Sequence, residues 1–191
     1  LGRPHPAEDA WRAAGRAALP AVGALPGPRV ALLIGGPTTQ VPWTLQALAA
    51  QCNAVQAQVR AAGGSLLITA SRRTPPEVVA LLRTLQQGNP GLLWCDARDG
   101  ANPYAGLLGW ADAIVASADS VNLLSEACAT PVPVVAACAE FARGRVGAYV
   151  QALQQRQRLC AADEVLATTA AMTPVRETER IAAQVRMRLG L

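Results

Sequence analysis

Residues 102–135 read NPYAGLLGWADAIVASADSVNLLSEACATPVPVV, and the pattern in this stretch decides the fold. An apolar run at 113–116 ends in a polar turn, and a helical pattern then leads to a second apolar run at 132–136. Two buried strands joined by a helix are typical of a parallel βαβ unit. In parallel sheets, ligands bind beyond the carboxyl ends of the strands, where backbone N–H groups and helix N-termini face solvent. The polar turn at 117–120 is therefore a candidate ligand site.

The same alternation of strand and helix extends along the rest of the chain. Apolar runs predict strands at 29–34, 65–70, 92–95, 113–116 and 132–136, with a further short strand at 164–167. Further helical patterns lie at 7–19, 43–62, 75–87, 103–110, 141–159 and 175–189. We therefore predict an α/β fold, a Rossmann-like three-layer domain with a parallel sheet of five to six strands. This domain is expected to span 29–191, with an N-terminal helix and linker over 1–28.

Two helix starts carry recognisable caps. Thr74, Pro75 and Glu77 have the spacing of a capping box, which predicts Thr74 as the N-cap and Pro75 as the first helical residue. Asn102 is predicted to cap the next helix, with Pro103 as its first residue.

Composition narrows the classes of function. The chain has 191 residues, 51% of them hydrophobic, and a formal charge of +4 that comes from scattered arginines without any lysine. Because no basic stripe with interleaved aromatic residues occurs, we exclude a nucleic-acid partner. The five cysteines show no C-x-x-C spacing and the sole histidine is His5, so we expect neither a metal site nor a disulfide framework. No apolar run reaches the ~18 residues of a membrane span, so we expect a cytoplasmic protein.

A glycine loop follows the first predicted strand, with Gly35, Gly36, Pro37, Thr38 and Thr39 in succession. Glycines let a backbone approach a ligand closely, and the threonines add hydroxyl groups. The loop matches neither the G-x-G-x-x-G fingerprint nor a P-loop. Two interpretations stay open: a loop that contacts a ligand, or a plain turn between strand and helix.

Ser71, Arg72 and Arg73 follow the second predicted strand, just before a helix N-terminus. Guanidinium groups and a helix dipole at this edge favour an anion such as a diphosphate. For either arginine the alternative is a side chain that is solvated or paired within the protein.

The turn after the fourth predicted strand carries several polar groups between two apolar runs. Ser117 and Asp119 lie in the turn, and either Asp119 or Ser120 is predicted to cap the next helix. Ser125 and Glu126 lie further along that helix. A carboxylate such as that of Glu126 can accept hydrogen bonds from two sugar hydroxyls. The alternative is an internal hydrogen bond from Glu126 to a neighbouring loop.

The aromatic residues allow fewer conclusions. Tyr104 follows the predicted Asn102 cap, and it suits either a pocket wall on which a base stacks or the edge of the core. Trp43, Trp94 and Trp110 are expected to lie in the core or to cover the sheet.

Three segments occur in an order that resembles a known family. LIGGPTTQ at 33–40, GGSLLITASRRTPPE at 63–77 and the stretch at 102–135 are similar to the mitochondrial fission "elongated mitochondria" family, and the chain is identified as a bacterial member. The resemblance covers nearly everything from 29 to 135. That family is similar to GT-B glycosyltransferases, in which two Rossmann-like domains face each other across a cleft. The resemblance implies that this chain is the C-terminal, donor-binding half.

The resemblance also implies roles for individual residues. The segment at 116–135 is similar to the donor-binding segment of the peptidoglycan N-acetylglucosaminyltransferase, in which a Ser-Glu pair on a helix reaches the donor. By that pattern Glu126 would hold the ribose hydroxyls. Asp119 departs from the transferase pattern, because an acid there would repel a diphosphate unless a cation or Arg72 compensates. The residues expected to contact the nucleotide, with no metal ligand among them, are Gly35, Gly36, Thr38, Ser71, Arg72, Asn102, Ser117, Asp119, Ser120, Ser125 and Glu126.

Two functions follow from these observations. The first is binding of a nucleoside diphosphate or nucleotide-sugar, UDP-linked ligands included, as the donor side of a hexosyltransferase-type enzyme. Such a chain lacks the N-terminal domain and is not expected to be active alone; it begins at Leu1, as a processed product or a piece of a longer protein would. The second is a non-catalytic protein-interaction module, with peripheral contact at the inner membrane allowed. An epimerase or dehydrogenase is disfavoured, because the sequence has no G-x-G-x-x-G fingerprint and, without any lysine, no Tyr-x-x-x-Lys pair.

Overall fold

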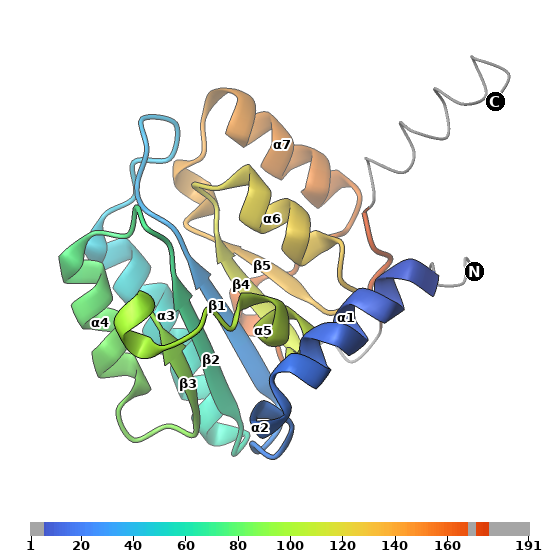
Figure 1. Ribbon diagram of the computed structural model, residues 1–191. Helices are drawn as coiled ribbons and strands as arrows, with labels where there is room; N and C mark the ends of the chain where they lie inside the picture. The colour runs from blue at the N-terminus through green and yellow to red at the C-terminus, as the bar shows by residue number, and fades with distance from the viewer. Residues whose placement is uncertain (1–5, 168–170, 176–191) are drawn as a thin grey trace, which may run out of the picture.

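A five-stranded parallel sheet forms the centre of the protein. The computed structural model describes residues 6–167 and 171–175 (Figure 1). The strands are β1 (Arg29–Ile34), β2 (Ser65–Ala70), β3 (Gly91–Trp94), β4 (Ala113–Ser117) and β5 (Val134–Ala137). They lie in the order β3-β2-β1-β4-β5, and every neighbouring pair is parallel. The predicted Rossmann-like α/β fold is thus confirmed, and the direction of winding reverses between β1 and β4.

Helices cover both faces of this sheet (Figure 1). Those on one face are α3 (Leu45–Ala61) and α4 (Pro76–Gln86), and those on the other are α1 (Pro6–Ala18), α5 (Tyr104–Trp110) and α6 (Val121–Cys128). The short helix α2 (Pro20–Gly23) leads into β1, and α7 (Gly144–Gln155) follows β5. Within the described residues, no helix is long and apolar enough to cross a membrane.

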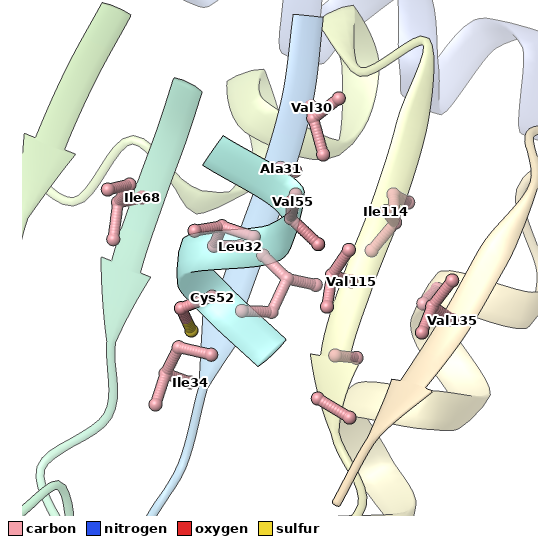
Figure 2. Packing of buried hydrophobic residues seen from close by; sticks show 14 of the residues in the cluster. Val30, Ala31, Leu32, Ile34, Cys52, Val55, Ile68, Ile114, Val115 and Val135 are labelled. Carbon is pink, nitrogen blue, oxygen red and sulfur yellow. The ribbon is translucent and has the colours of Figure 1, made fainter. Parts of the chain in front are cut away.

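The core lies on both sides of the sheet, with buried residues from α3 and α4 on one face and from α5 and α6 on the other. Every residue of β1 from Val30 to Ile34 is at most 1% exposed, which is expected of a strand covered on both faces. Figure 2 shows Cys52 and Val55 of α3 beside Leu32 and Ile34 of β1. Burial raises the pKa of the Cys52 thiol to about 12, so this cysteine acts as a small apolar side chain.

The predicted capping box at the start of α4 is wrong. The N-cap is Pro75, and no side chain caps the helix. The hydroxyl of Thr74 instead donates to the carbonyl oxygens of Ile34 (3.0 Å) and Gly35 (2.8 Å), while the N–H of Ser71 donates to it. The carbonyls at the end of β1 lie within hydrogen-bonding distance of Thr74. Its hydroxyl therefore links the end of β1 to Ser71, which follows β2, and does not cap the helix.

Two further sequence predictions need correction or fall outside the described residues. A strand at 164–167 is absent: Ala162–Glu164 forms a 3₁₀ turn, in which the Glu164 N–H donates to Ala161 O over 3.1 Å. The segment does not pair with the sheet, because the N–H groups of Glu164 and Ala167 donate to carbonyl oxygens three residues earlier in the same segment. Helix α5 begins at Tyr104 with Pro103 as N-cap, one residue later than predicted, although Asn102 Oδ1 accepts the Tyr104 N–H (2.9 Å) as a cap would. The predicted helix at 175–189 lies outside the described residues.

Helix α1 lies directly on α5 (Figure 1). The contact is so close that a Cβ added at Gly15 would lie 2.3 Å from the carbonyl oxygen of Ala105. The guanidinium groups of Arg12 and Arg16 both donate to the carbonyl oxygen of Gly109 (3.2 Å each), near the C-terminus of α5. Cations at this position also interact favourably with the helix dipole.

A buried arginine holds the C-terminus of α6. Arg158 is 1% exposed, and its guanidinium donates to the carbonyl oxygens of Cys128 (3.0 Å), Thr130 (2.5 Å) and Val132 (3.1 Å). Burial lowers the pKa of this side chain. The carbonyls left without partners at the end of α6 therefore find a donor about thirty residues further along the chain.

Candidate functional site: the carboxyl edge of the sheet

A buried polar cluster lies at the switch point between β1 and β4. Its centre is Asp119, whose carboxylate accepts the Gly36 N–H (3.1 Å) and the indole N–H of Trp43 (3.2 Å). The Gly35 N–H donates to the hydroxyl of Ser117 (2.7 Å) at the end of β4. We call these five residues the Asp119 cluster. It ties the loop after β1 to the turn after β4, so the backbone donors of Gly35 and Gly36 already have partners within the protein.

Steric fit explains why both loop positions are glycine. A Cβ at Gly35 would lie 2.0 Å from Oδ2 of Asp119, and a Cβ at Gly36 would lie 2.2 Å from the carbonyl oxygen of Arg73. Real Cβ contacts are essentially never shorter than 3.0 Å. The close approach that these glycines permit is therefore to other parts of the same chain.

The charge of Asp119 is compensated by a neighbour at the surface. The side chain of Asp119 is fully buried, and its Oδ2 lies 3.8 Å from Nη2 of Arg73, whose side chain is 59% exposed. Burial raises the pKa of Asp119 above its ordinary value, while hydrogen bonds from Ser117, Trp43 and Gly36 act in the opposite direction. Arg73, rather than the Arg72 considered from the sequence, is the cation next to this carboxylate.

An open pocket of about 530 Å³ lies beside the cluster, over the carboxyl ends of β1, β2 and β3. We call it the edge pocket. Its walls come from the three strand ends and from the starts of α5 and α6. The residues that line it are Ile34, Thr69, Ala70, Ser71, Arg72, Trp94, Asn102, Tyr104, Asn122, Leu123 and Glu126.

One wall of the edge pocket carries a carboxylate that is held in place. The hydroxyl of Tyr104 donates to Oε2 of Glu126 over 2.5 Å, which joins α5 to α6. Burial, and then this hydrogen bond to Glu126, raise the pKa of Tyr104 above its ordinary value. Tyr104 thus stays a donor, and Oε1 of Glu126 accepts no hydrogen bond from any residue the structure describes.

Another part of the pocket wall carries a cation and amides. Arg72 is exposed and makes no hydrogen bond or ion pair with the described part of the chain. Asn122 likewise has no partner among the described residues. Asn102, by contrast, uses its Oδ1 for the Tyr104 N–H and leaves its amide N–H₂ for other contacts. The edge pocket therefore combines one guanidinium, one carboxylate and free amide donors.

The structure divides the residues expected to contact a nucleotide into three groups. Ser71, Arg72, Asn102 and Glu126 line the edge pocket. Gly35, Gly36, Ser117 and Asp119 belong to the Asp119 cluster.

The third group makes local contacts elsewhere. The hydroxyl of Thr38 accepts the Val41 N–H (3.1 Å) in the loop after β1. Ser120 is the N-cap of α6, which confirms one of the two predicted caps. Ser125 points to α7, where its hydroxyl lies 2.8 Å from that of Tyr149. Neither Thr38, Ser120 nor Ser125 lines the edge pocket.

The sequence interpretation did not place Trp94 and Asn122 in a site. Trp94 ends β3 and lines the pocket, with its indole N–H donating to Gly100 O over 3.0 Å. Its position at a strand's carboxyl end was the available signal, as it was for Ser71. Among the residues that the structure describes, no group of three His, Cys, Asp or Glu side chains could hold a metal ion.

The order of the strands and the edge pocket together define the class of protein. It is a Rossmann-like α/β domain with a ligand-sized pocket beside its switch point. The sequence model of the family described as "Mitochondrial fission ELM1" matches residues 1–189, and the chain belongs to this family. The mitochondrial fission protein ELM1 of Arabidopsis thaliana is 32% identical over 169 residues, which cover 87% of this chain and 39% of that protein. The chain thus spans about two fifths of the length of that curated relative. No solved structure matches.

Proposed function

We propose that the edge pocket binds a nucleoside diphosphate or nucleotide-sugar. One observation carries this proposal: a single pocket of about 530 Å³ holds both a guanidinium that has no partner among the described residues and a carboxylate that is held by a tyrosine. Pockets for small ligands measure roughly 300–1,000 Å³ and place a few polar groups among apolar walls. The edge pocket has this size and this mixture.

Each end of the ligand has a chemically suited partner. Oε1 of Glu126, which has no donor among the residues that the structure describes, accepts hydrogen bonds from ribose hydroxyls, and the hydrogen bond from Tyr104 keeps the carboxylate oriented. Arg72 lies just beyond the end of β2 and donates to phosphate oxygens there. In the whole protein this domain would be the donor side of a hexosyltransferase-type reaction, with further groups supplied from outside the edge pocket.

A thermal-shift titration with UDP, GDP, ADP and TDP tests the binding. A ligand at 100 times its Kd stabilises the folded state by about 2.7 kcal/mol, which is a readily measured rise in Tm. Glu126→Ala should abolish this rise, while the Tm of the free protein falls by only about 2–4 °C because the hydrogen bond from Tyr104 is lost as well. Asp163→Ala is the matched control, since Asp163 is also exposed but lies in the turn packed against α3.

The outcomes separate the two functions inferred from the sequence. A rise with one nucleotide that Glu126→Ala removes and Asp163→Ala retains supports nucleotide binding in the edge pocket. If the wild type gives no rise with any nucleotide, the binding proposal is overturned. The non-catalytic interaction module then becomes the better description. A rise that survives Glu126→Ala would place the ligand elsewhere.

A further inference from the structure

Donors of the kind that bind anions converge at the switch point between β1 and β4. The backbone N–H of Gly36, the indole N–H of Trp43 and the guanidinium of Arg73 all point to the carboxylate of Asp119. Backbone N–H groups of a glycine loop next to an arginine commonly bind phosphate at this position in doubly wound sheets. Here the anion that they surround is a side chain of the protein.

We propose that Asp119 is an internal anion that decides where a phosphate can bind. It fills the site formed by Gly36, Trp43 and Arg73, and thereby excludes the phosphates of a ligand from the glycine loop. Phosphates are left with the Ser71–Arg72 side of the edge pocket. This inference rests on the proposed function, because it states where the phosphates of the proposed nucleotide bind at the carboxyl edge of the sheet.

Space and charge both support the exclusion. The Oδ2 atom of Asp119 lies so close to Gly35 that even a single added carbon atom would overlap with it, at 2.0 Å. A phosphate brought into contact with the loop would also face a fully buried negative charge. Repulsion between like charges is strong where water is excluded, so a second anion is disfavoured there.

The two adjacent arginines then have different tasks. Arg73 lies 3.8 Å from Asp119 and balances the internal anion. Arg72 has no partner among the described residues and lines the edge pocket, where its guanidinium is available to a ligand. Asp119 therefore acts as a specificity-determining residue: it uses the donors of the loop and leaves Arg72 to bind the phosphate.

Amide chemical shifts of the wild-type domain test this assignment directly. Titration with UDP, and separately with pyrophosphate, should shift the amides of Ser71 and Arg72 and leave those of Gly35 and Gly36 unchanged. A saturable shift of the Gly35 and Gly36 amides, as large as that at Arg72, would overturn the proposal. This measurement needs no variant, so it holds even if changes at Asp119 prevent folding.

Chemical rescue provides the second test. In Asp119→Ala, formate should replace the missing carboxylate, shift the Gly36 amide and Trp43 indole signals saturably, and raise the Tm by about 3–5 °C at ten times its Kd. Asp112→Ala is the control: Asp112 also accepts a backbone N–H, that of Arg29 (2.8 Å), but its side chain is 49% exposed, so formate should give no saturable rise. If the Asp119→Ala variant folds but formate changes neither these signals nor its Tm, the proposal is contradicted.

Failure of the proposed function gives a different pattern. If no nucleotide shifts any amide of the wild type, nucleotide binding is wrong, while formate rescue still decides whether Asp119 occupies an anion site. If nucleotides bind but Gly35 and Gly36 respond, binding stands and the internal-anion assignment falls.

Discussion

The carboxyl edge of the sheet holds two neighbouring polar regions that differ in where their hydrogen bonds go. In the Asp119 cluster the donors of Gly35, Gly36 and Trp43 end on side chains of the same protein. In the edge pocket, Arg72 and one oxygen of Glu126 have no partner among the described residues. Similar residue types at the same edge thus stabilise the fold in the Asp119 cluster, whereas in the edge pocket they remain available to bind a ligand. The comparison predicts that substitutions in the cluster cost folding energy, whereas substitutions in the pocket cost ligand affinity.

The largest expected effect is that of Gly35→Ala in the cluster. The added Cβ would overlap with Asp119 Oδ2 at 2.0 Å, and the fully buried carboxylate has little room to move. We expect the free energy of unfolding to fall by about 3 kcal/mol, measured by urea denaturation.

Gly27→Ala is the control for this substitution, because its nearest neighbour would be 3.7 Å away, an ordinary contact. It should change stability by less than about 0.5 kcal/mol. Equal stability of the two variants would show that the loop can relax, and that the cluster is less tightly closed than described.

An intermediate effect is expected for Tyr104→Phe in the pocket. Removing the hydroxyl deletes the hydrogen bond to Glu126, at a cost of about 1 kcal/mol at neutral pH. Because the folded pKa of Tyr104 is raised above the ordinary value of 10.0, its contribution to stability is complete below pH 10.0 and is lost as the pH rises further.

Urea unfolding at neutral pH and again above pH 10.0 measures this dependence. The difference in stability between wild type and Tyr104→Phe should shrink at the higher pH. A difference that stays constant or grows would contradict the raised pKa.

The smallest effects on stability separate the two adjacent arginines. Arg73→Ala removes the cation beside Asp119, and since the arginine side chain is 59% exposed we expect a loss of only about 0.5–1 kcal/mol. Arg72→Ala should leave stability unchanged within about 0.5 kcal/mol. In nucleotide titrations the order reverses, because Arg72→Ala should weaken binding more than Arg73→Ala does. The same order in both measurements would contradict the division between cluster and pocket.

Much of the fold could be predicted from the sequence, because it depends on local pattern. The mostly apolar runs at 29–34 and 65–70 match β1 and β2 residue for residue, since a strand buried on both faces lacks the alternation of apolar and charged residues that a half-exposed strand shows. Patterns failed where a side chain had a distant partner. Thr74 looks like a helix cap in sequence, but its hydroxyl binds carbonyls at the end of β1.

The site was predictable only to the level of the sheet edge. Glu126 and Arg72, which the sequence assigned to a ligand at this edge, both line the edge pocket, and their contact with a ligand stays a prediction. The sequence could not show that Asp119 pairs with Arg73, or that Ser125 faces Tyr149 on another helix. Such pairings depend on how helices are rotated by tertiary packing, which spacing within one segment does not encode.

The contact between α1 and α5 has a practical consequence for fragment design. An expression fragment that starts at β1 would remove Arg12 and Arg16 from the last carbonyls of α5, and would uncover the face of α5 on which Gly15 packs. It would also take away Leu19, whose carbonyl accepts the indole N–H of Trp110. Shortened versions used for screening or crystallisation should therefore retain residues 6–28, so that this face of the domain does not become a new surface for aggregation.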